Sequence, residues 1–282
     1  MPIEDIDQLK VWQPLYRGEA PIFDGILEPG TAMLIFGPPK SWKSITTIYT
    51  AYTIATGSSW FGHRTTTCPV IIFQAELPKA VHKRRVVKFD SCTPIPKNIM
   101  FETNRYCKLN TSYGRDILKS VILEAQSRFP RQHMVLILDP VYLLMSGKIS
   151  EEYDVRCMLD NINDLRETYN LSIILIHHSH KTRVTSDGTI VDTGSDEIFG
   201  SGYLNFWCDT QVRLKRLNPF SLDNQIGFSF TLTRNAESVL SPFDVEWSRA
   251  TLQPTVIATR LVQSQTEEDV TTRGLSGEVK YN

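Results

Sequence analysis

The sequence contains no apolar run that approaches the roughly 18 residues needed to span a lipid bilayer. Its first residues, MPIEDIDQLK, are acidic and lack the basic-then-apolar pattern of a secretory signal. These two absences predict a cytoplasmic protein without a membrane segment.

Paired cysteines and an excess of one charge are also missing. The five cysteines form no CxxC pair, so we expect reduced thiols rather than a disulfide framework or a zinc module. The net charge of −1 argues against an overall basic field, although a basic surface lining the inside of a ring would be hidden in this average. With 282 residues, 41% of them hydrophobic, the chain can form one large globular domain with appendages.

Strand-length apolar runs alternate with helical stretches from residue 32 onward. The predicted strands are 32–37, 69–76, 133–140, 171–178, 209–217, 227–235 and 243–248, and the predicted helices are about 43–56, 78–90, 114–128 and 155–168. The first four strands are almost continuously apolar, which is typical of strands covered on both faces. This order predicts an α/β fold with a mainly parallel sheet flanked by helices. After about residue 205 the strands follow one another without helices, so we expect antiparallel strands there.

The expected organisation has three parts. Residues 1–30, with several prolines and aromatics, predict an irregular N-terminal arm; 31–250 form the core; and 251–282 form a polar C-terminal tail.

GPPKSWKS, at residues 37–44, has the pattern of a loop that binds phosphate groups between a strand and a helix. Such a loop directs backbone N–H groups, a lysine and a helix N-terminus at the phosphates of ATP, and its hydroxyl binds Mg²⁺. Lys43 and Ser44 supply the lysine and the hydroxyl, whereas Pro38 and Pro39 donate no N–H. The alternative is an ordinary strand-to-helix turn with a surface lysine. The predicted nucleotide contacts are Gly37, Pro38, Pro39, Lys40, Ser41, Trp42, Lys43, Ser44 and Ile45.

Trp42 stands where this loop pattern has glycine. Glycine permits an unusual dihedral or a close approach to phosphate. We expect a negative φ at Trp42, so that the indole points away from the nucleotide while its backbone N–H stays available. A positive φ, or an indole in the phosphate space, would contradict this interpretation.

Two carboxylates end predicted strands. Asp139 follows VLIL and is the expected partner of Ser44 in holding Mg²⁺. Glu76 follows VIIFQA and is placed to orient or deprotonate the attacking water. Each has a simpler explanation, since aspartate caps turns and glutamate stabilises helix N-termini. Their joint occurrence at strand ends, where open α/β sheets bind ligands, favours the functional interpretation.

A histidine cluster ends a fourth strand. His177, His178 and His180 suggest a metal site, but no further Cys or His pair completes a familiar ligand spacing. We therefore favour a histidine that donates a hydrogen bond to the γ-phosphate and reports its loss to the long polar segment 181–200.

With these residues in place, the chain resembles the RecA/DnaB-like ATPase superfamily, and within it the RepA-type hexameric replicative helicases of plasmids and phages. The likeness covers roughly residues 20–250 and rests on motifs in the family's order: FQAELPKAVHKRR, LDPVYLLMSGKISEEYD, ILIHHSHK, FGSGYLNFWCDTQVRLKR and TLTRNAES. It implies a RecA-like P-loop NTPase core that binds ATP and Mg²⁺ and assembles as a homo-oligomer, with six subunits in the family's usual form.

The resemblance also implies roles for single residues. Glu76 would be the catalytic carboxylate, Arg85 its helper near the γ-phosphate, and His178 the sensor. Arg234 would be an arginine finger that reaches the nucleotide of the neighbouring subunit. One departure is Leu232, where ring helicases often place a lysine.

The implied central channel would bind single-stranded DNA through two loops. Lys148 in the first loop, with Lys181 and Arg183 in the second, are the candidates for sequence-independent phosphate contacts. The alternative for all three is solvated surface charge.

The sequence thus predicts an ATP-hydrolysing, ring-forming motor on DNA, most simply a replicative helicase. Two alternatives remain. One is a recombination or loader ATPase of the RadA or KaiC kind, which assembles without unwinding. The other is a nucleotide-dependent scaffold with little hydrolysis, which Trp42 suggests but the hydrolytic residue set argues against.

Overall fold

A computed structural model gives the fold. It describes residues 5–11, 20–179, 183–184, 190–191, 198, 202–217, 224–234, 236–237 and 239–260. Within this part of the chain, no helix is both long and apolar enough to cross a membrane.

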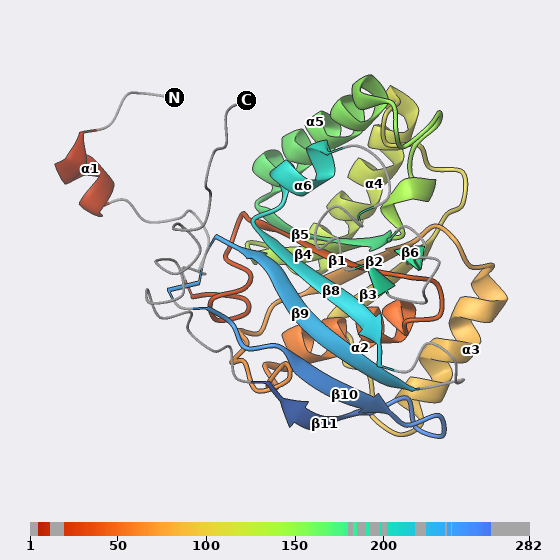
Figure 1. Cartoon of the computed structure of the whole chain (residues 1–282). Coiled ribbons are helices and arrows are strands. Elements are labelled where there is room, and N and C mark those ends of the chain that lie inside the picture. Colours follow the sequence, from red (N-terminus) through yellow and green to blue (C-terminus); the bar gives the residue numbers. More distant parts are fainter. Residues whose placement is uncertain are drawn as a thin grey trace, which may run out of the picture.

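The structure is built on a nine-stranded sheet with the order β11-β10-β9-β8-β1-β5-β4-β2-β3 (Figure 1). The strands are β1 (Ala32–Gly37), β2 (Val70–Gln74), β3 (Ile99–Thr103), β4 (Met134–Asp139), β5 (Leu171–His178), β8 (Thr210–Arg216), β9 (Gln225–Thr233), β10 (Phe243–Trp247) and β11 (Pro254–Thr259). A separate two-stranded pair joins β6 (Arg183–Val184) and β7 (Ile190–Val191). The strands from β3 to β8 across the sheet are parallel, and β9, β10 and β11 are antiparallel.

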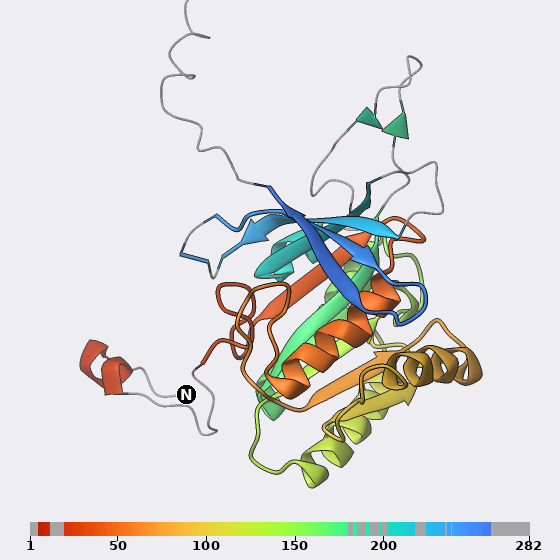
Figure 2. The ribbon, with the colours of Figure 1, turned by 90° about the horizontal axis from the view of Figure 1, so that it is seen from below.

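Helices cover both faces of the parallel part of the sheet (Figures 1 and 2). One face is packed by α2 (Lys43–Thr56) and α3 (Lys79–Asp90), and the other by α4 (Ser112–Arg128), α5 (Glu152–Tyr169) and the short α6 (Tyr203–Trp207). The remaining helices are α1 (Ile6–Val11) and a 3₁₀ turn at Val141–Leu143. The central strands are buried on both sides, which explains their continuous apolar sequences.

Local sequence fixes the ends of the helices. α2 ends at Gly57, whose φ of 70° lets its N–H turn back to the carbonyl of Ile54. α4 begins after Thr111, whose hydroxyl accepts a hydrogen bond from the N–H of Gly114. The crossovers built in this way bring the carboxyl ends of β1, β2, β4 and β5 to one edge of the sheet.

The expected mainly parallel α/β sheet with antiparallel strands near the C-terminus is confirmed. The sequence missed β3 and β11, and the antiparallel part begins only at β9, because β8 still runs parallel to β1. The sheet continues to Thr259, past the boundary expected at 250. In the N-terminal arm expected to be irregular, Ile22, Phe23, Ile26 and Leu27 are buried in the core. The polar segment 263–282 lies outside the described residues.

Candidate nucleotide site

A pocket of about 730 Å³ opens at the carboxyl edge of the parallel strands. Its size is suited to a nucleotide-sized ligand. Its walls come from the loop between β1 and α2, the ends of β2, β4, β5 and β8, helix α3, and the turn between β10 and β11. The lining residues are Pro39, Lys40, Ser41, Trp42, Lys43, Ser44, Ile45, Glu76, Leu77, Val81, Arg84, Arg85, Lys88, Asp139, His178, Arg216, Arg249 and Leu252.

The phosphate loop is held in shape by its own lysine. The Nζ of Lys43 donates to the carbonyls of Gly37 and Pro38, at 2.7 Å each, and lies 3.4 Å from the hydroxyl of Ser41. Burial lowers the pKa of Lys43 to about 8, while Asp139 opposes that shift. Gly37 is required sterically, because a Cβ there would come within 2.5 Å of the Leu214 carbonyl.

The expected negative φ at Trp42 is wrong. Trp42 has φ 60° and ψ 16°, the left-handed conformation that a glycine would adopt most easily. For a residue with a Cβ this costs about 1–2 kcal/mol. The indole stacks on Trp247 at the end of β10, with ring centroids 5.9 Å apart and planes 9° apart, and such a pair offsets a cost of this size. The phosphate loop therefore keeps the left-handed backbone conformation expected of a glycine at this position, although the residue is a tryptophan.

Asp139 is almost fully buried beside the phosphate loop. Its Oδ2 accepts hydrogen bonds from the Nε2 of Gln74 at 3.1 Å and from the hydroxyl of Thr47 at 3.4 Å. Burial and the charge of Glu76 raise the pKa of Asp139 to about 6, against the opposing effect of Lys43. A carboxylate held in this way, with the Ser44 hydroxyl on the same pocket, suits the hydration shell of Mg²⁺.

Gln74 links the two carboxylate positions, and sequence reasoning missed it. Its amide nitrogen binds Asp139, and its amide oxygen accepts from the backbone N–H groups of Glu76 and Leu77 at 2.7 and 3.1 Å. The signal was its place at the end of a buried apolar strand, where a polar side chain needs partners. One buried amide thus fixes the position of Glu76 relative to Asp139.

His178 and Arg85 complete the phosphate end of the pocket. Burial, together with the charge of Lys43, lowers the pKa of His178 to about 4, so the ring is neutral near pH 7. Tyr142 contacts it edge-on, with centroids 5.1 Å apart. Among the residues that the structure describes, no three His, Cys, Asp or Glu side chains are grouped to hold a metal ion. His180 lies outside them.

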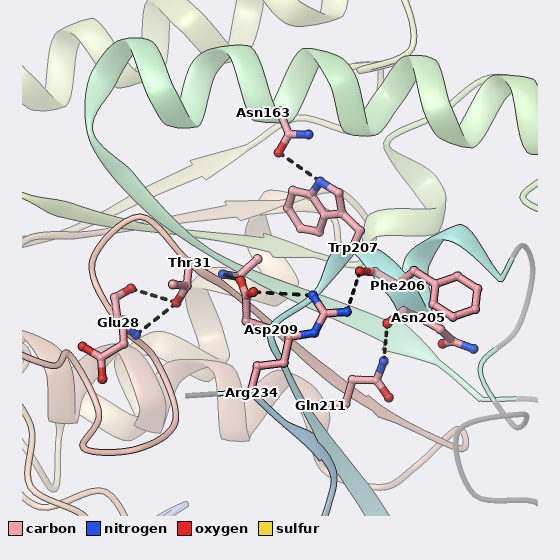
Figure 3. A network of polar contacts seen from close by, with 10 residues as sticks. Glu28, Thr31, Asn163, Asn205, Phe206, Trp207, Asp209, Gln211 and Arg234 are labelled. Carbon is pink, nitrogen blue, oxygen red and sulfur yellow. Dashed lines mark hydrogen bonds and ion pairs between the residues drawn. The ribbon is translucent and has the colours of Figure 1, made fainter. Parts of the chain in front are cut away.

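Arg234 lies at the amino end of the parallel strands β1 and β8, whereas the pocket lies at their carboxyl end. Figure 3 shows Arg234 beside Asp209 and Phe206. Arg234 follows the end of β9, and its backbone N–H donates to the backbone carbonyl of Asp209, the residue before β8. Its guanidinium lies 3.7 Å from the Asp209 carboxylate and donates to the Phe206 carbonyl at 3.1 Å. The other oxygen of Asp209 accepts from the N–H of Ala32, where β1 begins.

The structure describes the surroundings of only one of the three DNA candidates, Lys148. Lys148 is exposed in the turn between the 3₁₀ turn and α5. Arg183 lies in β6, and its side chain is not among the described features; Lys181 is outside the described residues.

The sequence profile of a family described as "AAA domain" matches residues 17–184, more than half of the chain. The chain belongs to this family. The match includes the phosphate loop, Glu76, Asp139 and His178, and it identifies the chain as a P-loop ATPase domain with a RecA-like fold. No curated protein gives a significant match.

Solved structures share the fold at low sequence identity. One of them, described as an ATPase domain, aligns with a TM-score of 0.62 and 10% identity over 86% of this chain and 93% of its own. A DnaB-like replicative helicase, solved for its interactions with primase, aligns at 0.60 and 11% over 86% of this chain, which spans 64% of that longer chain. A KaiC-like protein from the archaeon Pyrococcus horikoshii OT3 aligns at 0.54 and 13%, over 87% of this chain and all of its own. The AAA-domain chain thus shares one architecture with proteins of differing roles.

Proposed function

We propose that this AAA-domain protein hydrolyses Mg-ATP and couples hydrolysis to movement along DNA as a ring-forming motor, with unwinding of replicating DNA as its role. The observation that carries the proposal is the joint placement of Lys43, Glu76, Asp139 and His178 on one pocket. A site that only bound nucleotide would need the lysine but not a second carboxylate beside the phosphates.

The proposed chemistry divides among the pocket residues. Lys43 and the loop N–H groups bind the β- and γ-phosphates, and Asp139 with Ser44 holds Mg²⁺, which neutralises charge on the phosphates. Glu76 orients the attacking water and accepts its proton. His178, neutral at pH 7, donates one hydrogen bond to the γ-phosphate and loses that partner after hydrolysis.

Arg234 requires a second subunit in this proposal. It lies at the amino end of β1 and β8, away from its own pocket, so in this proposal it acts only on the nucleotide of a neighbour. An arginine supplied in this way stabilises charge in the transition state and is worth about 10³-fold or more in rate. Lys148, Lys181 and Arg183 would then be the candidates for DNA contacts in the centre of the assembly.

Steady-state ATP turnover tests the proposal directly. We expect Glu76→Gln to lower kcat by about 100-fold or more while nucleotide still binds, because the water loses its base. Lys43→Ala should abolish binding. Glu102→Gln, which changes a half-buried carboxylate on the neighbouring strand β3, is the matched control and should behave as wild type. Equal turnover in all four proteins would contradict hydrolysis at this site.

A non-unwinding ATPase is the second candidate, because the KaiC-like structure aligns over its whole length with the same fold. A strand-displacement assay on forked DNA separates the two. Unwinding that needs ATP and Glu76 supports the helicase. ATP turnover stimulated by DNA, without displacement, supports the second candidate.

A further inference from the structure

The nucleotide pocket is lined by two chemically different groups of residues. One group surrounds Lys43 and carries the titratable side chains described above. The other comprises Trp42, with Leu252 and Arg249 from the turn between β10 and β11, and Arg216 at the end of β8. A nucleotide has the same division, with phosphates at one end and an aromatic base at the other. Since Lys43 and its neighbours suit the phosphates, the apolar surface of Trp42 and Leu252 is the part of the lining suited to the base.

The indole of Trp42 is held in place by a cluster of aromatic rings. One face of its indole rests on Trp247, which is itself fully buried. Tyr49 and Phe61 hold Trp247 edge-on, with centroids 5.9 and 6.4 Å away. Trp42 is only half-buried and lines the pocket, so the face turned away from Trp247 is the one available to a ligand.

The surroundings of this face are suited to a flat aromatic ring. Leu252 and Ile45 add apolar surface to the same pocket, and Arg216 and Arg249 add guanidinium groups that can donate hydrogen bonds or stack. No described group accepts a hydrogen bond from the buried Nε of Arg216. The turn that carries Arg249 is tied to α3, because the Nζ of Lys88 donates to the Arg249 carbonyl at 2.6 Å.

We propose that the open face of Trp42 is the stacking platform for the base of the bound nucleotide, so that one residue of the phosphate loop binds both ends of the ligand. The inference rests on the proposed nucleotide function and assigns its base subsite. It also gives a physical reason for the left-handed backbone at Trp42, because that conformation directs the indole onto Trp247 beside the pocket.

The experiment compares two ligands of the full chain, Mg-ATP and inorganic tripolyphosphate, by titration calorimetry. Tripolyphosphate reports the phosphate contacts alone, so the ratio of its Kd to that of ATP measures the contribution of the nucleoside. Trp42→Gly is the decisive variant because glycine accepts the same φ without strain. It should lower this ratio by about tenfold, the size of one base–aromatic stack, while tripolyphosphate binds as in wild type.

Further variants separate the possible failures. Trp42→Phe keeps a ring and should keep most of the ratio. Lys43→Ala should lose both ligands; if it binds both as wild type does, the proposed phosphate site itself is wrong, whatever Trp42 does. An unchanged ratio in Trp42→Gly, or an equal loss of both ligands, would overturn the stacking platform.

Tryptophan fluorescence tests the platform in the wild-type protein, so the main comparison does not depend on the folding of a Trp42 variant. In wild type, ATP should quench tryptophan emission by stacking on Trp42, and tripolyphosphate should not. Trp60→Phe, which removes a fully buried indole absent from the pocket lining, is the control and should retain the quench. Quenching of the same size with both ligands would count against the platform.

Discussion

The charged form of Asp139 is needed for the proposed Mg²⁺ site, but its burial makes that charged form unfavourable for the stability of the fold. It is buried among apolar strands, and its pKa is raised from 3.8 to about 6. The folded protein therefore holds a proton that the unfolded chain releases at lower pH, so the stability from Asp139 is fully present below pH 4. It declines as the pH rises to about 6.

Asp139→Asn should consequently stabilise the nucleotide-free protein near pH 7, by at most roughly 3 kcal/mol, because the buried charge is removed. Near pH 4 the difference from wild type should vanish. Urea denaturation at several pH values between 4 and 7.5 measures it. A difference that grows as the pH falls would contradict the raised pKa.

For single residues, the sequence predicts the charged groups of the pocket but not the contacts that hold them in place. Lys43, Glu76 and Asp139 were found because each follows an apolar strand, and parallel strands deliver their ends to one edge. The left-handed φ of Trp42 could not be predicted from the sequence, because the ring that stacks on it and offsets its strain belongs to Trp247, about 200 residues away in the chain. Gln74 was overlooked for a similar reason, since both of its roles depend on β4 lying beside β2.

Among the elements, the junction of β1, β8 and β9 depends on Asp209. Its carboxylate accepts from the Ala32 N–H at 2.9 Å and also faces Arg234. Asp209→Ala would leave that N–H without its acceptor, whereas Asp209→Asn keeps an oxygen in place.

We therefore expect Asp209→Ala to lose about 1–3 kcal/mol of unfolding free energy and Asp209→Asn to lose much less. Chemical denaturation of the two variants measures the difference. Equal losses would mean that the ion pair with Arg234, rather than the hydrogen bond to β1, is what stabilises the junction.

The elements that sequence predicted well are those buried on both faces. β1 and β5, and helix α2, were placed to the residue, because continuous apolar runs and a Gly57 cap leave little freedom. β3 and β11 are the two edge strands of the sheet. Their exposed positions carry polar and apolar side chains alike, so no periodic pattern marks them.

For the whole molecule, the key feature is that Lys43 and Arg234 lie near opposite ends of the β1–β8 strand pair, separated by about the length of β1, roughly 17 Å. A complete site would combine the pocket of one subunit with the arginine of the next. Two inactive variants should then complement each other.

Lys43→Ala and Arg234→Ala should each hydrolyse ATP poorly alone. Mixed in equal amounts and allowed to exchange subunits, they should recover about one quarter of wild-type turnover, the fraction of interfaces that pair an intact loop with an intact arginine. Coupled-enzyme assays at several mixing ratios measure this. Mixtures that stay inactive after confirmed subunit exchange would show that Arg234 does not act between subunits.

If Arg234 acts on the pocket of a neighbour, the subunit is directional, because its arginine and its pocket lie at opposite ends of the strands. A linear assembly built from such units would carry one pocket without an arginine and one arginine without a pocket, whatever its length. Joining the two ends removes both defects at once. Activity per subunit in short open assemblies would thus lag behind that of closed ones, so that closure itself acts as a switch for turnover.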